Sequence, residues 1–267
     1  MPDFTDTPLK NIIELRGIDQ SYNNGKIEII KGLDFLIEDK PAQGQFCSIL
    51  GMSGCGKSTV LRYIAGLQEP TAGKVLINNK EVSEDNRVAM VFQQYSSLPW
   101  MTVLENVSLA LDFKGVDKKE KKEKAMEMIE LVGLAGHENK YAQYPTLSGG
   151  QLQRVAIARS LIANPEILLM DEPFGALDVN TRLQMQDLLL NLWHKFHPTI
   201  IFVTHDISEA VYLGDEIYIM KSAPSRFVEK ISVDLPFHRT RETKRDPKFI
   251  ELVQRVEDTM VNVAALG

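Results

Sequence analysis

The sequence lacks a cysteine framework, a secretory signal and any long apolar run. It has two cysteines, Cys47 and Cys55, which are too few for a disulfide network and are not spaced like metal ligands. Residues 1–6 do not show the basic and then apolar pattern of a signal peptide. No apolar run approaches the ~20 residues that a membrane-spanning helix needs. These absences predict a chain of a reducing, cytoplasmic compartment, in which any membrane association comes from a partner.

Positive charge is also scarce. The 36 acidic side chains outnumber the 30 lysines and arginines, and the formal net charge is −6. Proteins that bind nucleic acid broadly present a basic surface, so we expect no nucleic-acid partner. The lysine-rich residues 117–124 are interrupted by glutamates and continue into an amphipathic pattern, so we expect a solvated helix face there.

One segment, residues 51–59, has the sequence GMSGCGKST and matches the pattern G-x-x-x-x-G-K-[ST] at every position. It lies between an expected strand at 46–50 and an expected helix at 58–65. Glycines let successive N–H groups converge on one anion, and the helix N-terminus adds partial positive charge. An ordinary glycine-rich turn is a poor alternative for a full match in this context. This phosphate loop predicts a nucleoside-triphosphate site that uses Gly51, Ser53, Gly54, Cys55, Gly56, Lys57, Ser58 and Thr59.

Two adjacent acids, Asp171 and Glu172, end the apolar run at 167–172. At the carboxyl end of a sheet that already carries a phosphate loop, such acids are best explained by metal and water. Side chains alternate along a strand, so the two acids should have different roles. We expect Ser58 and Asp171 to bind Mg²⁺, Lys57 to reach the β- and γ-phosphates, and Glu172 to face the attacking water.

Another apolar strand, residues 199–203, delivers His205 to the same edge of the sheet. A lone histidine is usually a surface or capping residue. Here Asp206 and Glu209 have the spacing of a helix cap, which leaves His205 free at the tip of the strand. Its neutral N–H is expected to donate to the charge that develops on a γ-phosphate.

Gln93 and Tyr22 are weaker candidates. Gln93 follows the apolar strand expected at 87–92, where a glutamine is usually a surface residue. At the edge of a phosphate site its carbonyl is also suited to complete a Mg²⁺ shell or to orient a water. Tyr22 precedes a turn at residues 23–25 and is either a turn-flanking aromatic or a platform for a purine ring.

A second glycine-containing turn, residues 147–151, opens a helix expected at 152–163. Ser148 and Gln151 have the spacing of a capping box, which alone accounts for the pattern. Gly149 and Gly150 do not favour a helix start, and they make sense if a second phosphate approaches the backbone closely. Both interpretations of this signature turn remain open at this stage.

The order of patterns predicts an α/β fold with an antiparallel β layer at its N-terminus. Strands are expected at 11–18, 33–38, 46–50, 74–77, 87–92, 167–172, 199–203, 216–220 and 227–235, and later helices at 181–196 and 246–261. Residues 102–162 show helical patterns and no convincing strand. We therefore divide a single domain, residues 1–267, into a nucleotide-binding core (10–94 and 163–230), a helical sub-domain (95–162) and a C-terminal extension (231–267).

The loop after Gln93 carries Leu98, Trp100 and Met101, three large apolar residues in a short stretch. We expect several of them to be exposed and to form a docking groove for a membrane subunit. The alternative is that they pack beneath the helical sub-domain, since single exposed apolar groups are normal.

Taken together, these features resemble the ATP-binding subunit of ABC transporters over about residues 11–225. Lys57 and Ser58 match the Walker A motif, and Asp171 and Glu172 match Walker B with its catalytic acid. Gln93 matches the Q-loop, residues 147–151 match the signature motif, and residues 176–178, with Asp178, match the D-loop. His205 matches the switch histidine and Tyr22 the adenine-stacking aromatic. Details around residues 92–100 and 174–178 are most similar to the nitrate, sulfonate and taurine importer branch.

This resemblance implies a P-loop NTPase fold with a RecA-like core, ATP and Mg²⁺ as cofactors, and hydrolysis of ATP. It implies that two cassettes pack head to tail, so that Ser148, Gly149, Gly150 and Gln151 of one, with Asp178, close over the phosphate loop of the other. The further partners implied are integral-membrane permease subunits and, indirectly, a solute-binding protein. The protein would then lie peripherally at the cytoplasmic face of the membrane and drive uptake of a small anion.

Three other classes share parts of this pattern. ABC-type ATPases of DNA repair or chromosome structure need a coiled-coil insertion, paired zinc-type cysteines or a basic face, which are missing here. Translation-associated factors carry two cassettes, whereas this chain has one phosphate loop. The signature turn argues against a bare phosphotransferase.

Overall fold

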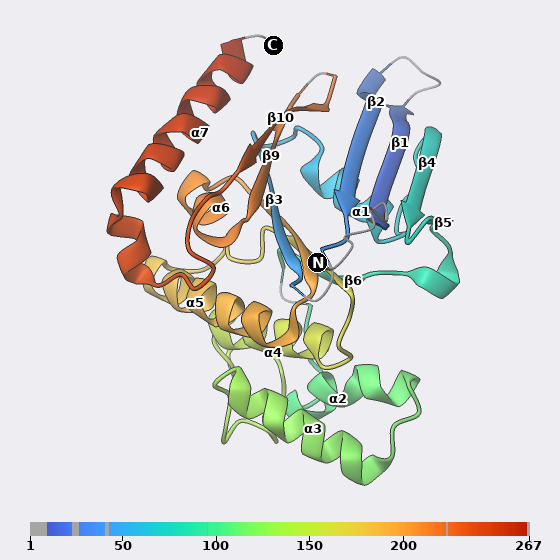
Figure 1. Ribbon diagram of the computed structural model, residues 1–267. Coiled ribbons are helices and arrows are strands. Elements are labelled where there is room, and N and C mark those ends of the chain that lie inside the picture. The colour runs from blue at the N-terminus through green and yellow to red at the C-terminus, as the bar shows by residue number, and fades with distance from the viewer. Residues whose placement is uncertain (1–9, 23–26, 41–42, 95, 223, 266–267) are drawn as a thin grey trace, which may run out of the picture.

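A six-stranded sheet carries the candidate site. The computed structural model describes residues 10–22, 27–40, 43–94, 96–222 and 224–265. The strand order in this sheet is β10-β9-β3-β8-β7-β6, and all neighbours are parallel except β10, which runs antiparallel to β9 (Figure 1). Its strands are β3 (Gln45–Gly51), β6 (Ala89–Val91), β7 (Ile167–Asp171), β8 (Thr199–Thr204), β9 (Glu216–Lys221) and β10 (Arg226–Ser232).

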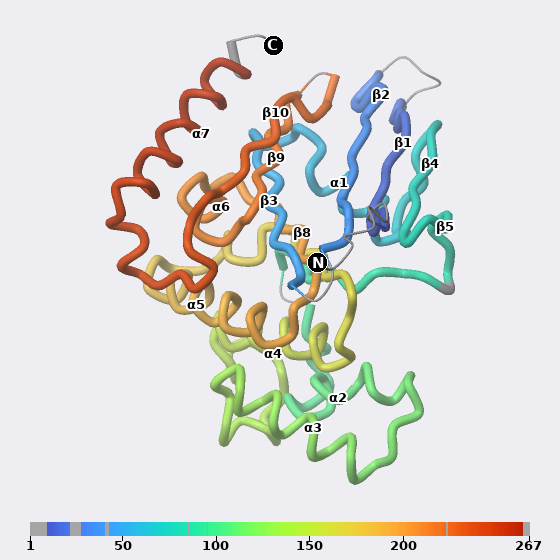
Figure 2. The backbone as a smooth tube through the Cα atoms, viewed as in Figure 1, coloured from blue at the N-terminus to red at the C-terminus, as the bar shows by residue number. Residues whose placement is uncertain are grey.

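A separate antiparallel sheet packs beside it, as predicted, but it draws strands from both sides of the phosphate loop. Its order is β2-β1-β4-β5, with β1 (Asn11–Tyr22), β2 (Ile27–Glu38), β4 (Ala72–Ile77) and β5 (Lys80–Glu81). Helix α1 (Lys57–Ile64) contacts both β4 and the parallel strands, and the backbone trace in Figure 2 shows this arrangement. One core fills this side, built from alternate strand residues such as Cys47 and Ile49.

The opposite residues of the same strands, such as Phe46 and Leu50, face a second core. This face is covered by α5 (Val179–Phe196), α6 (Ile207–Leu213) and α7 (Pro247–Ala265). Two short 3₁₀ helices, η1 (Glu84–Asn86) and η2 (Arg241–Arg245), lie in the connections before β6 and before α7. Because the parallel strands are buried on both faces, they appear in the sequence as continuous apolar runs.

Helices α2 (Val103–Phe113) and α3 (Lys118–Leu131) project from one end of the structure, and α4 (Gly149–Leu161) contacts them on one side and β6 and α5 on the other (Figure 1). These three helices lie in the region expected to form the helical sub-domain, and no strand lies within residues 102–162, all of which the structure describes. The capping box of Thr102 with Glu105 is present at the start of α2. Lysines and glutamates of α3 lie exposed, as expected, and Lys124 pairs with Glu120 at 2.7 Å.

Several predicted boundaries were wrong. The strand expected at 87–92 is only the three-residue β6, because η1 immediately precedes it and Phe92 already leaves the core. The strand expected at 227–235 begins at Arg226 and ends at Ser232, and it pairs with β9. This pairing makes β10 an edge strand of the six-stranded sheet.

No helix in the described ranges combines the length and the apolar character needed to cross a bilayer.

Cys47 and Cys55 are both free and buried, so neither is part of a disulfide. Burial raises the pKa of each thiol above its ordinary value, which keeps both cysteines protonated and unreactive.

Candidate nucleotide-binding site

The phosphate loop connects the central strand β3 to α1. Gly54 and Gly56 adopt φ values of 81° and 92°, which L side chains rarely accept. At Gly51 the constraint is space, because a Cβ there would lie 2.6 Å from the backbone carbonyl oxygen of Met220. The three glycines therefore each allow a backbone course that presents N–H groups at the start of a helix.

Lys57 lies inside this loop and is only 5% exposed. Its Nζ donates to the carbonyl oxygens of Gly51 at 2.8 Å and Met52 at 3.0 Å, and it lies 4.0 Å from Glu172 Oε1. A buried ammonium held by loop carbonyls beside a carboxylate supplies a fixed positive charge at the loop. This is the place where the terminal phosphates of a bound nucleotide are expected.

Ser58 and Asp171 meet, as the sequence predicted. The Ser58 hydroxyl donates to Asp171 Oδ1 at 2.8 Å. Burial raises the pKa of Asp171, and the hydrogen bond from Ser58 opposes this rise. A hydroxyl and a carboxylate are hard oxygen donors that suit Mg²⁺, which usually takes one or two protein ligands and completes its shell with phosphate and water. The described residues contain no cluster of three or more His, Cys, Asp or Glu that could enclose a metal by themselves.

Glu172 directly follows β7 with a left-handed backbone, φ of 44°, and its side chain has other partners than Asp171. Its Oε2 lies 3.0 Å from His205 Nδ1 and accepts a bond from Gln93 Nε2 at 3.4 Å. These side chains come from the ends of β7, β8 and β6, which are neighbours in the sheet. The Glu172 carboxylate therefore lies beside nitrogen atoms of His205, Gln93 and Lys57, at the edge where the phosphate loop begins.

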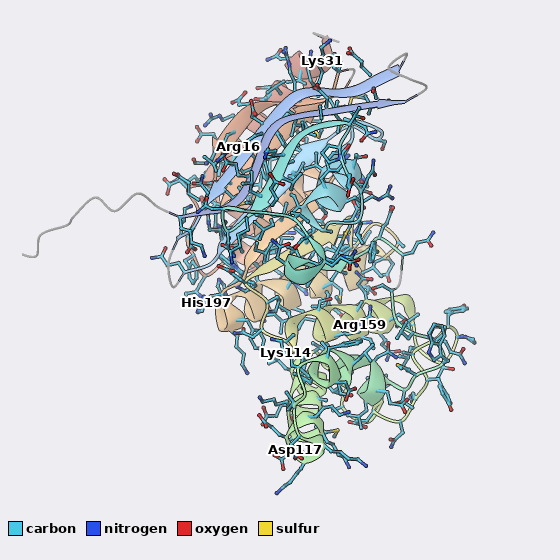
Figure 3. The ribbon with its side chains drawn as sticks, turned by 90° about the vertical axis from the view of Figure 1, so that its right-hand side faces the viewer. Arg16, Lys31, Lys114, Asp117, Arg159 and His197 are labelled. Atoms are coloured by element: carbon cyan, nitrogen blue, oxygen red, sulfur yellow. The ribbon has the colours of Figure 1, made fainter. Side chains whose placement is uncertain are left out.

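The position of Gln93 is supported by a contact that the sequence did not indicate. Arg159 of α4 donates to the carbonyl oxygen and the hydroxyl of Ser96, at 2.6 and 3.2 Å. Figure 3 shows Arg159 at the level where the core meets the helical sub-domain. This arginine fastens the loop after Gln93 to the helix that begins at the signature turn.

The signature turn forms the predicted capping box. Gln151 N donates to Ser148 Oγ at 3.3 Å, and Ser148 N donates to Gln151 Oε1 at 2.9 Å. The helix begins at Gly149, so both glycines belong to its first turn rather than preceding it. Gly150 also has a packing reason, since a Cβ there would lie 2.5 Å from Thr181 Cγ2. The turn belongs to the helical sub-domain, whereas the phosphate loop belongs to the core.

Asp178 caps α5 with its carboxylate. Its oxygens accept bonds from the backbone N–H groups of Asn180 and Thr181, both at 3.1 Å, and from the Thr181 hydroxyl at 2.6 Å. The bond from the Thr181 hydroxyl is the largest cause of a lowered pKa at Asp178. Thr181 thus contacts both Asp178 and the first turn of α4. The D-loop and the signature turn of the same chain therefore lie side by side.

Two further predictions have different outcomes. Tyr22 is the last residue of β1, and its side chain lies outside the described residues, as do the turn at 23–26 and part of the loop at 39–45.

The expectation of several exposed apolar groups after Gln93 was wrong. Trp100 is 68% exposed, but Leu98 and Met101 are half-buried because their backbone groups bond to Asn106 of α2.

Known proteins resemble this chain over most of its length. The aliphatic sulfonates import ATP-binding protein SsuB of Bacillus subtilis is 45% identical over 221 residues, 82% of this chain and 84% of that protein. The nitrate import ATP-binding protein NrtD of Synechocystis sp. is 38% identical over 243 residues, 88% of this chain and 89% of that protein. A dimeric post-hydrolysis ATP-binding cassette bound to ADP and Pi superposes with a TM-score of 0.71 and 33% identity, covering 84% of this chain and all of that one.

The sheet order, the phosphate loop and the paired acids define a P-loop nucleoside triphosphatase. The family model described as ABC transporter matches residues 37–175. The chain therefore belongs to the ABC transporter family, as an ATP-binding subunit with ATPase activity. The resemblance and the fold class that the sequence predicted are confirmed.

Proposed function

We propose that this chain is the ATP-hydrolysing subunit of an importer that takes up a small anion such as nitrate, a sulfonate or taurine. The observation that carries the hydrolytic role is the position of Glu172, which lies among His205, Gln93 and Lys57 at the mouth of the phosphate loop. The names of the nitrate and sulfonate import relatives support the choice of solute class.

In this proposal the residues divide the work of phosphoryl transfer. Lys57 and the loop N–H groups bind the β- and γ-phosphates, and the Tyr22 ring stacks on the adenine. Ser58, Asp171 and Gln93 would hold Mg²⁺, which neutralises charge on the phosphates when bound. Glu172 orients and polarises the attacking water, and His205 donates a hydrogen bond to the γ-phosphate.

The second half of the site comes from another cassette. Ser148, Gly149, Gly150 and Gln151 form the start of α4, a second helix N-terminus besides that of α1 at the phosphate loop. A head-to-tail dimer would place this helix start, with Asp178, over the γ-phosphate held by Lys57 of the partner copy. Either an identical copy or a close homologue satisfies this geometry, and the solved relative described above is a dimer.

Dimerisation provides a direct test. Glu172→Gln should elute as a dimer from size exclusion in Mg²⁺-free ATP and as a monomer in ADP, because uncleaved ATP holds two chains together. Adding Ser148→Arg should abolish the dimer, since a bulky cation then occupies the place of the partner's γ-phosphate. The matched control is Thr102→Arg, which removes the equivalent N-cap of α2. Loss of the dimer in both variants, or in neither, would contradict the assignment of the signature turn.

The membrane partner is expected at Trp100, so that the protein lies peripherally at the cytoplasmic face of the membrane. Trp100→Ser should strongly reduce uptake of nitrate, sulfonate or taurine in cells that depend on this chain, because an exposed indole is a strong anchor at an interface. A solute-binding protein and the permease would choose among these anions. Phe113→Ser is the control, since Phe113 is 86% exposed and is the last residue of α2, whereas Trp100 precedes the start of that helix. A Trp100→Ser chain that fails to fold in isolation would show that Trp100 is a packing residue instead.

A further inference from the structure

A buried carboxylate lies behind His205. Glu209, in the first turn of α6, is 4% exposed, and its Oε2 accepts a bond from the Thr204 hydroxyl at 2.6 Å. The same hydroxyl accepts a bond from Asp206 N at 3.1 Å. Thr204 and Asp206 flank His205 in the chain, so Glu209 orients the one hydroxyl that ties together the backbone on both sides of the histidine.

A second side chain connects this carboxylate to the C-terminal extension. Gln186 of α5 donates from Nε2 to Glu209 Oε1 at 2.9 Å, and its Oε1 accepts a bond from Lys244 Nζ at 2.8 Å. Lysine can only donate, so Lys244 fixes the Gln186 amide with its oxygen outward and its nitrogen toward Glu209. A continuous series of hydrogen bonds therefore runs from η2 to the end of β8.

The charges along this series depend on each other. A buried carboxylate is costly unless it is hydrogen-bonded and paired with a cation. Burial raises the pKa of Glu209, and the bonds from Thr204 and Gln186 oppose this rise. Burial lowers the pKa of Lys244, and nearby carboxylates, Glu209 among them, oppose this fall. Lys244 also lies 4.2 Å from the centroid of the Tyr212 ring, which holds the ammonium in place.

We propose that Glu209 and Lys244 are positioning residues for ATP hydrolysis, which hold the His205 backbone so that the imidazole stays against Glu172. This inference rests on the proposed role of His205. It also gives the C-terminal extension a function, because Lys244 sets the geometry of a site that it does not touch. The predicted helix cap is present, because Asp206 accepts a bond from Glu209 N, but the spacing did not indicate that the Glu209 side chain turns inward to Thr204.

The test is a pair of substitutions that reverses the order of donors and acceptors. Glu209→Gln replaces a carboxylate that accepts bonds from both Thr204 and Gln186 with an amide that has one acceptor oxygen and one N–H group. Whichever way this amide turns, one of the two bonds is lost or must reverse. We expect roughly a tenfold loss in kcat with KM for ATP changed by less than about twofold, because a small misplacement of a catalytic group lowers the rate more than it lowers binding. Lys244→Glu alone should also lower kcat, since an acceptor then faces the Gln186 oxygen.

Combining Glu209→Gln with Lys244→Glu restores alternating donors and acceptors from Thr204 to residue 244. The double variant should therefore recover kcat to within about threefold of the wild-type value. Lys248→Glu is the control, because Lys248 lies in the same extension and pairs with Asp234 at the surface. A double variant no faster than its parents would overturn the proposal.

A purely structural role for this network is distinguished by repeating the substitutions in a His205→Ala chain. Single-turnover hydrolysis, which resolves slow rates, should then show no further loss from Glu209→Gln or Lys244→Glu. An equal loss in both backgrounds would mean that the network merely stabilises α6. If His205→Ala itself leaves hydrolysis unchanged, the proposed role of His205 fails, and this inference fails with it.

Discussion

Glu172→Gln should lower the rate of ATP hydrolysis by about 10²–10⁴-fold, the usual contribution of a positioned acid or base. The amide keeps the shape of the carboxylate beside His205 and Gln93 but cannot accept a proton from water. ATP binding should survive, because the bonds of Lys57 to the loop carbonyls and of Ser58 to Asp171 are not altered. Steady-state phosphate release at saturating ATP measures the first effect, and fluorescent-nucleotide titration measures the second.

The matched control is Glu166→Gln at the opposite end of the same strand. Glu166 precedes β7 and is half exposed, with contacts to Lys10 and Asn78 only at the surface. Its substitution should leave hydrolysis within about twofold of wild type, as surface changes usually have small effects. A Glu172→Gln variant that hydrolyses ATP at the wild-type rate would assign the catalytic role to another residue.

The parts of the site that the sequence predicted are those that depend on short-range patterns. The phosphate loop, Asp171, Glu172 and His205 each follow an apolar strand, and parallel strands bring such positions to one edge of a sheet. The different directions of Asp171 and Glu172 were also predicted from strand alternation, although the structure adds a left-handed backbone at Glu172.

The parts that were missed depend on long-range partners. Arg159 and Ser96 are 63 residues apart, and Lys244 and Gln186 are 58 apart, so no local pattern indicates either contact. The predicted exposure of Leu98 was wrong for the same reason. Leu98 is held in by Asn106 of α2, and nothing in its own stretch of sequence distinguishes it from the exposed Trp100.

Arg239→Ala should lower the free energy of unfolding by about 3–5 kcal/mol, the usual loss when one partner of a buried ion pair is removed. The Arg239 side chain is 1% exposed and donates to Asp215 Oδ1 at 2.7 Å. It also donates to the carbonyl oxygens of Tyr212 and Gly214, at 3.2 and 2.8 Å. Asp215 in turn accepts a bond from Phe46 N at the start of β3. Arg239 therefore fastens the C-terminal extension to the central strand.

Thermal unfolding checks this expectation. For a chain of this size the loss corresponds to a fall in Tm of about 10 °C. Arg255→Ala is the control, because Arg255 lies exposed on α7 at 3.7 Å from Glu229, and such surface pairs contribute less than about 1 kcal/mol. Equal Tm values for the two variants would show that the buried pair adds nothing to the attachment of the extension.

The left-handed backbone at Glu172 lowers the stability of the fold, whereas the proposed role in ATP hydrolysis requires a glutamate at this position. The other non-glycine residues with positive φ in the described ranges are Asn78, Asn79, Asn164 and His197, types that tolerate this conformation. A glutamate in this conformation lowers the free energy of unfolding by about 1–2 kcal/mol relative to glycine, which has no Cβ. Glycine is the substitution that folding would favour, and it is also one that removes the carboxylate. If Glu172 has the role proposed above, selection for thermal stability alone would favour its loss, and the strained backbone persists because ATP hydrolysis requires this glutamate.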